Sequence, residues 1–267
     1  MSKHNKIYPT PPHELFEFSS KQHKYCLLIP IINEGDRIIK ELTTAKDHGI
    51  PRMIDIILCD GGSTDGSTEH ERLQSLGVNT ILIKKAPGKQ GTQLRIGFAF
   101  ALNRGYDGII TIDGNNKDSI KDVPSFIEKL DEDYDFVQGS RFVKGGHAEN
   151  TPISRLLAVK LIHAPIISLT AGKHYTDTTN NYRAYSRKYL THPDLQPFRD
   201  IFKTYELLAY LSVRADQLNL KTIEIPVSRT YPPKIAHSKT PTKISPIKGN
   251  TELIKILLLN LFRRYNP

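Results

Sequence analysis

Two short acidic turns, each at the end of an apolar run, constrain the fold of this chain most strongly. Cys59-Asp60-Gly61-Gly62-Ser63-Thr64-Asp65-Gly66-Ser67 follows the apolar run 54–58, and Asp113-Gly114-Asn115-Asn116 follows the run 108–112. Each run predicts a buried parallel strand, so each turn falls at the carboxyl edge of a sheet, where open α/β folds bind ligands. Two such turns in one domain indicate a site for a nucleotide diphosphate with a metal ion.

Strand and helix signals alternate through the first two-thirds of the chain. This alternation predicts an α/β domain, in which a mainly parallel sheet is flanked by helices on both faces. The expected strands are 25–31, 54–60, 80–83, 108–113 and 136–142, and the expected helices are 34–48, 67–76, 91–103 and 123–130. The pattern then changes, with helices expected at 153–170, 205–215 and 251–264 and strands at 182–185 and 222–227.

The positive charge of the chain is concentrated at its C-terminal end. The formal net charge is +9, and the last forty residues hold eight Lys/Arg against the single acid Glu252. A basic end of this kind indicates a phosphate-bearing partner, such as a pyrophosphate or an anionic lipid, or else a solvated tail. No RNA- or DNA-binding motif accompanies the charge, so a nucleic-acid partner is not expected.

The two cysteines, Cys26 and Cys59, both lie in apolar strand segments and have no metal-binding spacing. Buried reduced thiols are therefore expected, which favours a cytoplasmic location. The first 24 residues contain no signal-type apolar stretch. No run reaches the roughly 20 apolar residues of a membrane span, and the closest, 156–169, is interrupted by Lys160, His163 and Pro165.

The residue types at the turns suggest specific roles. The Asp60 carboxylate can accept hydrogen bonds from a base or a ribose. Oxygen ligands two residues apart, on Asp113 and Asn115, can face a Mg²⁺ or Mn²⁺ ion held by a diphosphate. Lys89, before a predicted helix N-terminus, adds a cation for the diphosphate. An ordinary Asp-Gly-Asn turn and a solvated loop lysine remain open as alternatives.

Further motifs occur in a fixed order along most of the chain: Ile29-Pro30-Ile31-Ile32-Asn33-Glu34, the Asp60 turn, Gly88-Lys89-Gln90-Gly91, Asp113-Gly114-Asn115, Gly139-Ser140-Arg141-Phe142, Asp177-Thr178-Thr179-Asn180-Asn181-Tyr182-Arg183-Ala184, and Glu224-Ile225-Pro226-Val227 with Arg229. This order resembles family 2 glycosyltransferases of the GT-A fold. The chain is most similar to the branch that contains dolichyl-phosphate mannose synthase and bacterial polyprenyl-phosphate sugar transferases.

The resemblance implies a role for each matching residue. The nucleotide-binding residues implied are Pro30, Glu34, Asp60, Gly61, Lys89, Asp113, Gly114 and Arg229. Asp113 and Asn115 occupy the positions for metal and diphosphate, with Mg²⁺ or Mn²⁺ as the cofactor. Arg141 and Asp177 lie near the donor sugar and the acceptor, while Arg229 and a basic loop with Lys239 and Lys243 close over phosphate groups.

A hydroxyl acceptor would need a general base, for which Asp177 is the first candidate and Glu206 the second. Alternatively, Asp177 is a turn or helix-cap residue and Glu206 is bound to Arg183 at the edge of the core. The chain also departs from the family pattern, because Asn115 replaces the usual second aspartate. A neutral amide is a weaker ligand for a hard cation than a carboxylate is.

The expected function is inverting transfer of one sugar from a UDP-, GDP- or dTDP-linked donor to a polyprenyl-phosphate or glycan acceptor, in surface-polysaccharide or lipid-linked-sugar synthesis. A sugar nucleotidyltransferase and a non-catalytic relative that binds nucleotide sugars are the alternatives. The first alternative usually shows a Gly-rich stretch near the first strand, and residues 29–35 contain none.

The chain divides on this basis into a polar extension (1–22), a GT-A catalytic domain (23–230), and a basic loop with a C-terminal amphipathic helix (231–267). The apolar and basic side chains of that helix suit the surface of an anionic membrane, which would make the protein peripheral at the inner face of the cytoplasmic membrane. Packing of the helix on the catalytic domain, or a homodimer contact, is the alternative.

Overall fold

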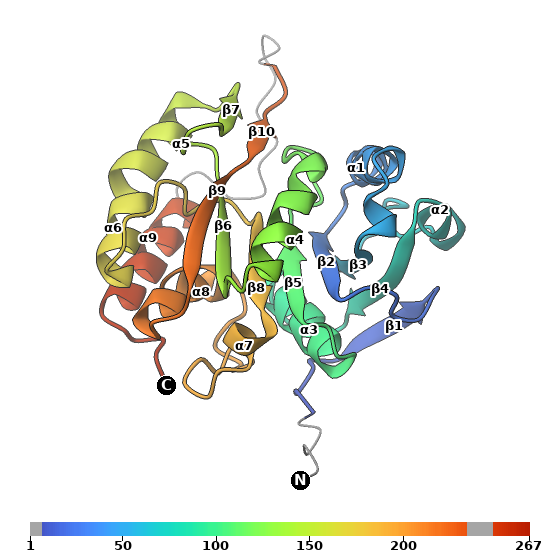
Figure 1. Cartoon of the computed structure of the whole chain (residues 1–267), viewed down its shortest axis with the longest axis horizontal. Coiled ribbons are helices and arrows are strands. Elements are labelled where there is room, and N and C mark those ends of the chain that lie inside the picture. The colour runs from blue at the N-terminus through green and yellow to red at the C-terminus, as the bar shows by residue number, and fades with distance from the viewer. Residues whose placement is uncertain (1–6, 234–247) are drawn as a thin grey trace.

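Eight strands form one mixed sheet through the centre of the protein, as the computed structural model describes it for residues 7–233 and 248–267 (Figure 1). In their order across the sheet, the strands are β1 (His13–Glu17), β4 (Val78–Lys84), β3 (Asp55–Asp60), β2 (Tyr25–Ile31), β5 (Gly108–Thr111), β8 (Arg183–Ser186), β6 (Phe136–Ser140) and β9 (Thr222–Pro226).

Two parallel blocks make up most of this sheet. Strands β4, β3, β2 and β5 run parallel to one another, and β6 runs parallel to β9. Strand β8 lies between the two blocks and is antiparallel to both β5 and β6. A second, two-stranded sheet pairs β7 (His147–Glu149) with β10 (Ser228–Thr230). The predicted class, a mainly parallel α/β sheet flanked by helices, is confirmed.

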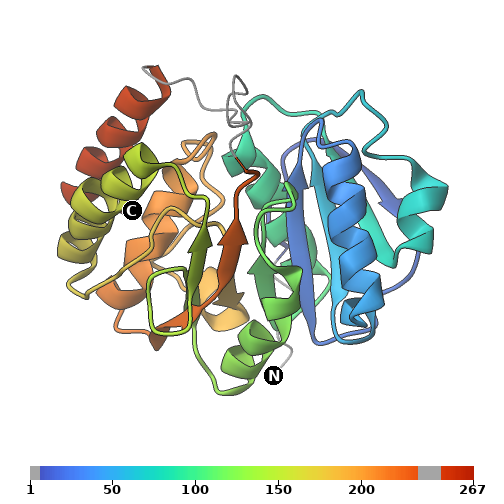
Figure 2. The ribbon, with the colours of Figure 1, turned by 90° about the horizontal axis from the view of Figure 1, so that it is seen from above.

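Helices cover both faces of the sheet (Figure 2). The side chains of β2 show this directly, because Cys26 and Leu28 join one buried cluster while Leu27 and Ile29 join the other. The longer helices on the Cys26 face are α3 (Gln90–Asn103), α6 (Ala164–Ala171), α8 (Glu206–Gln217) and α9 (Lys248–Leu261). Those on the Leu27 face are α1 (Asp36–Asp47), α2 (His70–Ser75) and α4 (Val123–Asp131).

The remaining helical segments are short. They are η1 (Ile50–Arg52), η2 (Ile120–Asp122), α5 (Ile153–Ala158), η3 (Val159–His163) and α7 (Arg187–Leu190). Helices α5, η3 and α6 follow one another without a break, and η3 is a π-helical turn just before Pro165. Proline has no N–H to donate, and a π turn is one way for a helix to accommodate that loss.

Several elements differ from the sequence expectations. Strands β7 and β10 and helix α7 are not among the expected elements, and β6 ends at Ser140 rather than at residue 142. Strand β1 lies inside the segment 1–22 and pairs with β4, so part of this polar stretch belongs to the sheet. Helix α2 begins at His70 rather than at residue 67, because Ser67 is held in the preceding turn by Asp65. Glu69 then caps the helix by accepting from the first free backbone N–H groups.

The helix Ile153–Ala171 is, by length and composition, long and apolar enough to cross a membrane. This differs from the sequence expectation, in which Lys160, His163 and Pro165 interrupted the apolar run. Most of it lies at the protein surface, side by side with α9 (Figure 2). Helix α9 packs on α6 and α8, and Asn260 donates a hydrogen bond to the carbonyl of Ala209. Lys239 and Lys243 of the predicted basic loop lie outside the described residues.

Candidate active site

A cleft of about 860 Å³ runs along the carboxyl ends of strands β2, β5 and β6. Nine of the twelve residues predicted as site residues line it: Pro30, Glu34, Gly61, Lys89, Asp113, Gly114, Asn115, Arg141 and Arg229. The other three, Asp60, Asp177 and Glu206, do not contribute to its wall. The topology therefore gathers most of the predicted site from six separate segments of the chain.

The cleft is strongly cationic. Of the described residues, only Glu34 and Asp113 bring a carboxylate to its wall. The Lys and Arg residues in the wall are Arg37, Lys84, Lys89, Lys117, Arg141, Arg155, Arg183 and Arg229. This imbalance suits a ligand that carries several negative charges, because cleft walls of low dielectric strengthen the field of the cations.

Asp113 follows β5, and its carboxylate stands among groups that can donate to it. Its Oδ1 accepts hydrogen bonds from Gln90 Nε2 at 3.1 Å and from Asn181 Nδ2 at 3.2 Å, while its Oδ2 lies 3.8 Å from Arg229 Nη2. Gly114 follows it where no side chain fits, since a Cβ would lie 2.5 Å from a side-chain carbon of β2. The close packing of this glycine on the sheet fixes the direction of Asp113.

The donor set at this turn fits a divalent ion that arrives with a diphosphate. Asn115 Oδ1 is buried and has no hydrogen-bond partner among the described residues, and it is close in sequence to the Asp113 carboxylate. The described chain holds no group of three or more His, Cys, Asp or Glu side chains able to hold a metal. Mg²⁺ sites in enzymes typically use one or two carboxylates and take their remaining ligands from substrate phosphates and water.

Arg229, on β10, is held at the cleft by a buried ion pair. Its Nη1 donates to Asp118 Oδ2, and the Asp118 side chain is inaccessible to solvent. Burial opposes the charge on Arg229, but Asp118 and Asp113 raise its pKa above the usual value. Burial also raises the pKa of Asp118, against the effect of Arg229. The guanidinium is therefore a fixed cation beside Asp113.

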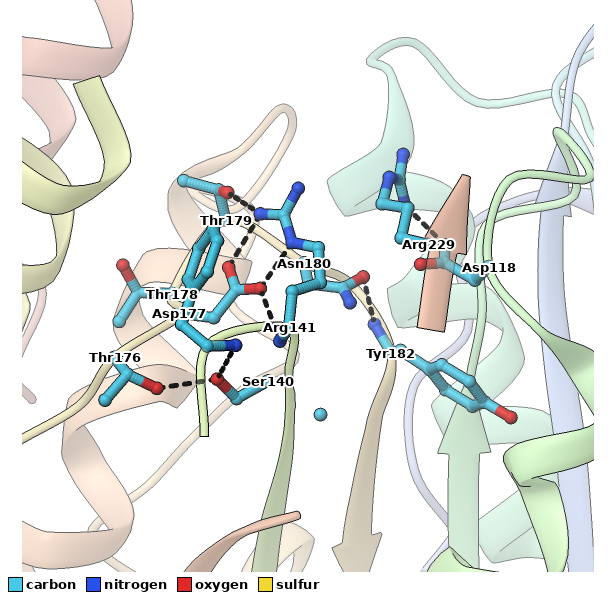
Figure 3. Close-up of polar contacts among 12 residues, drawn as sticks. Asp118, Ser140, Arg141, Thr176, Asp177, Thr178, Thr179, Asn180, Tyr182 and Arg229 are labelled. Atoms are coloured by element: carbon cyan, nitrogen blue, oxygen red, sulfur yellow. Dashed lines mark hydrogen bonds and ion pairs between the residues drawn. The ribbon is translucent and has the colours of Figure 1, made fainter. Parts of the chain in front are cut away.

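Arg141, which directly follows β6, is held by a second buried ion pair (Figure 3). Its Nε and Nη2 donate to the two oxygens of Asp177 at 2.6 and 2.9 Å, and Nη2 also donates to Thr179 Oγ1. Burial opposes the charge on Arg141, and the bonds to Asp177 raise its pKa. Nη1 makes no hydrogen bond within the part of the chain that the structure describes, and the residue lines the cleft.

Asp177 is not placed to act as a general base in this geometry. The residue is fully buried, and both of its oxygens are bonded to Arg141. Glu206 begins α8 and accepts hydrogen bonds from the amide and the hydroxyl of Thr204, at 2.6 and 2.8 Å. Arg183 bonds to backbone carbonyls, including that of Leu208, and not to Glu206. Neither carboxylate reaches the cleft wall.

Asp60 also occupies a structural position. It is 1% exposed, and its oxygens accept hydrogen bonds from the backbone amides of Gly62 and Ser63 and from the Ser63 hydroxyl. Asp60 therefore shapes the turn after β3, while the backbone of Gly61 lines the cleft. The nearby Ser67 hydroxyl links this turn to the turn that follows β2, because it accepts hydrogen bonds from the amides of Glu34 and Gly35.

Two residues of the cleft wall, Arg155 and Tyr231, could not be recognised from the sequence. Arg155 of α5 donates from Nη1 to Tyr231 Oη at 2.8 Å, and Lys117 and Arg229 also lie against the Tyr231 ring. Arg155 and Arg229 lower the pKa of this tyrosine, against its burial. Since the three cations come from segments far apart in sequence, only the fold brings them together. The single local signal for Arg155 is its place near the start of a predicted helix.

The fold and this cationic cleft define a GT-A protein, the class that binds nucleotide diphospho-sugars. The sequence model of Glycosyl transferase family 2 matches residues 26–192, more than half of the chain, and the chain therefore belongs to this family. It is accordingly a glycosyltransferase.

Individual relatives and solved structures are consistent with this assignment. The chain is 26% identical to a polyprenol monophosphomannose synthase of Mycolicibacterium smegmatis, over 76% of each chain. It is 26% identical to an undecaprenyl-phosphate mannosyltransferase of Micrococcus luteus, over 75% of this chain and 81% of the relative. In fold it is similar to glucosyl-3-phosphoglycerate synthase of Mycobacterium tuberculosis, solved with Mn²⁺, UDP and phosphoglyceric acid (TM-score 0.61, 17% identity, 90% of this chain and 78% of that chain).

A buried carboxylate beneath the Asp113 turn leads to a testable prediction. Glu41 of α1 is inaccessible to solvent, and its Oε2 accepts from the Asn116 amide at 2.8 Å. Burial, aided by the charges of Asp118 and Asp113, raises its pKa well above 4.5. The native state therefore holds this proton more tightly than the unfolded state does, so Glu41 lowers stability progressively as the pH rises above the unfolded pKa.

Replacement Glu41→Gln keeps the acceptor for Asn116 and removes the titration. We expect the variant to gain stability relative to the wild type by up to about 1.4 kcal/mol for each pH unit between the unfolded and the folded pKa. Urea unfolding at several pH values from about 4 to 8 measures this difference. Glu71→Gln, at an exposed carboxylate of α2, is the control. An equal pH dependence of the wild type and Glu41→Gln would contradict the prediction.

Proposed function

We propose that this glycosyltransferase moves one sugar from a nucleotide-sugar donor to a polyprenyl phosphate, with inversion at the anomeric carbon. The observation that carries the proposal is the contrast between the two ends of the cleft. Cations gather near Asp113, whereas the inner faces of the helix 153–171 and of α9 bring apolar side chains: Val159, Ile167, Leu253, Ile256 and Leu257. A phosphorylated lipid combines these two chemistries. The two relatives named above are a polyprenol monophosphomannose synthase and an undecaprenyl-phosphate mannosyltransferase.

The donor occupies the β2–β5 end of the cleft in this proposal. Pro30, Glu34 and Gly61 line the part that receives the nucleoside, and Asp60 shapes the turn that presents Gly61. The diphosphate of a UDP, GDP or dTDP sugar lies against Lys89 at the start of α3, near Asp113 and Gly114. Helix N-termini and lysines both favour such an anion.

Asp113 and Asn115 are the residues that would hold Mg²⁺ or Mn²⁺. When bound, the ion neutralises charge on the departing nucleotide diphosphate. Arg229 performs the same electrostatic task from the protein side, because its guanidinium stands 3.8 Å from Asp113 and is fixed by Asp118. A preorganised cation of this kind stabilises the charge that develops as the sugar leaves, without reorganising during the reaction.

The acceptor phosphate lies against Arg141 and Arg155 in this proposal. Arg141 keeps Nη1 for a ligand, and Arg155 donates to Tyr231 and forms no ion pair with a carboxylate of the described residues. A phosphate is already an anion, so it needs positioning rather than deprotonation. Because both candidate bases, Asp177 and Glu206, are bonded away from the cleft, the geometry favours this acceptor over a glycan hydroxyl.

The outer faces of the same two helices form a surface that suits a lipid bilayer. We call it the apolar flank; its exposed side chains are Ile153, Leu157, Leu161, Leu169, Ile254, Leu258 and Phe262. Exposed cations surround it: Lys160, Lys173, Lys255, Arg263 and Arg264. An apolar face bordered by cations is typical of binding to anionic membrane surfaces. The proposal places the protein in the cytoplasm, peripherally at the inner face of the cytoplasmic membrane.

The decisive experiment supplies the purified protein with UDP-, GDP- and dTDP-sugars, with and without Mn²⁺ or Mg²⁺, in the presence of undecaprenyl phosphate. We expect one nucleotide class to raise the melting temperature and to yield a sugar-linked lipid together with the free nucleotide diphosphate. No binding of any nucleotide sugar would refute the proposed donor site. Nucleotide binding without transfer to any lipid or glycan acceptor would indicate a non-catalytic relative. Formation of a nucleoside triphosphate and a sugar 1-phosphate on addition of pyrophosphate would indicate a nucleotidyltransferase.

The role of Asp113 is tested by an isosteric change. Asp113→Asn keeps the shape of the side chain and removes its charge, so we expect turnover to fall by about 100-fold or more. Asn115→Asp is the matched variant, because it supplies a second carboxylate at the same turn and should bind Mn²⁺ more tightly. Single-turnover kinetics and metal titrations measure the two effects. Near-normal turnover in Asp113→Asn would contradict the assignment.

The apolar flank is tested by removing two of its side chains. Leu161 is 70% exposed and Phe262 is 71% exposed, so changing both to Ser should leave the core intact. We expect co-sedimentation with vesicles that contain phosphatidylglycerol to fall by about tenfold or more, because less apolar area enters the lipid. Leu15→Ser, on the distant strand β1, is the control. Unchanged vesicle binding, or a wild-type homodimer in light scattering that the double variant abolishes, would contradict the membrane assignment.

A further inference from the structure

One motif of the sequence has no place in the site described so far. Glu224, on strand β9, opens the segment Glu224-Ile225-Pro226-Val227 and does not line the cleft. Its carboxylate instead accepts hydrogen bonds from the Thr176 amide at 2.9 and 3.0 Å and from the Asp177 amide at 3.1 Å. The Thr176 hydroxyl donates to it as well, at 3.0 and 3.1 Å.

The loop that Glu224 holds has no regular secondary structure. Residues 172–182 are all described and form no helix or strand. The Thr176 hydroxyl also lies 2.6 Å from Ser140 Oγ, at the end of β6 (Figure 3). Ser140 Oγ in turn accepts from the Phe142 amide. Glu224 and Ser140 therefore fix this loop from two neighbouring strands, just where it presents Asp177.

Arg141 depends on the position of this loop. The backbone of Asp177 is bonded to Glu224, while both oxygens of its side chain are bonded to Arg141. Two carboxylates thus act in series: Glu224 fixes Asp177, and Asp177 fixes the guanidinium that lines the cleft. Five residues after Glu224, the same β9–β10 segment supplies Arg229, so this one segment contributes to the positions of both Arg141 and Arg229.

We propose that Glu224 is a positioning residue for Arg141, and that it acts on acceptor binding and not on donor binding. This inference rests on the proposed function, in which Arg141 contacts the acceptor phosphate. A carboxylate suits the position because its two oxygens can accept from three donors at once. Loss of such charge-assisted bonds lets the loop and Arg141 move, and a displacement of about 1 Å is enough to weaken a positioned contact.

The experiment compares four variants of the full chain. Glu224→Ala removes the anchor, Glu224→Gln keeps one acceptor oxygen, and Thr176→Val removes only the hydroxyl. Thr222→Val is the matched control on the same strand, because its hydroxyl donates to Asp216 and makes no hydrogen bond to Thr176, Asp177 or Arg141. The measurements are the donor dissociation constant, the KM for undecaprenyl phosphate, kcat, and the ¹⁵N signal of Arg141 Nε–H.

We expect Glu224→Ala to raise the acceptor KM by about tenfold or more, with the donor dissociation constant within about twofold of the wild type. Glu224→Gln should restore the KM to within about threefold, Thr176→Val should fall between, and Thr222→Val should match the wild type. In Glu224→Ala, the Arg141 Nε–H signal should shift and exchange faster with water.

An unchanged acceptor KM in a folded Glu224→Ala variant would overturn the inference. So would a parallel loss of donor binding, or an equal effect of Thr222→Val, because either would indicate general disruption. If the wild type transfers no sugar to a lipid phosphate, the proposed function fails. The Arg141 Nε–H signal then still decides whether Glu224 positions Arg141, and an unaltered signal in Glu224→Ala would refute that.

Discussion

Two buried ion pairs set the geometry on which the cleft depends. Arg141 with Asp177 and Arg229 with Asp118 hold their charges away from water, where an unpaired charge would be strongly destabilising. Such pairs often add little net stability, and their contribution here is to orientation. Each carboxylate binds one part of its guanidinium and leaves the rest of the group directed at the cleft. The cations are therefore in place before a ligand arrives, and binding does not have to order them.

The sheet explains why the cleft lies where it does. Strand β8 runs antiparallel between β5 and β6, and so separates the two parallel blocks of the sheet. The chain segments that leave β5 and β6 consequently diverge, and open sheets bind ligands at such a change in connectivity. Asp113 leaves the first block and Arg141 leaves the second. In the proposed reaction, the donor and the acceptor each belong to one block, and the sugar crosses between them.

The sequence predicted the class of fold and nine residues of the cleft wall, but not the hydrogen bonds that hold them. Tyr25–Ile31 matches its predicted bounds because a continuous apolar run leaves little freedom, whereas strand β1 is short, half-polar and at the edge of the sheet. Because Asp60 ends a predicted strand, the sequence placed it correctly at the carboxyl edge of the sheet. It did not reveal that local amides take up its carboxylate. Arg155 could not be found at all, because its partner Tyr231 is 76 residues away.

In the proposed membrane-bound state, the apolar flank changes how the acceptor concentration has to be expressed. An enzyme held on a bilayer by this flank meets its nucleotide sugar in three dimensions and its lipid in two, at a cleft lined by the inner faces of the same helices. The relevant measure of the lipid is its mole fraction in the surface and not its molarity. Inert lipid would then dilute the acceptor and slow the reaction at a constant total amount of both substrates. In the proposed membrane-bound state, the composition of the bilayer would thereby set the rate of the reaction.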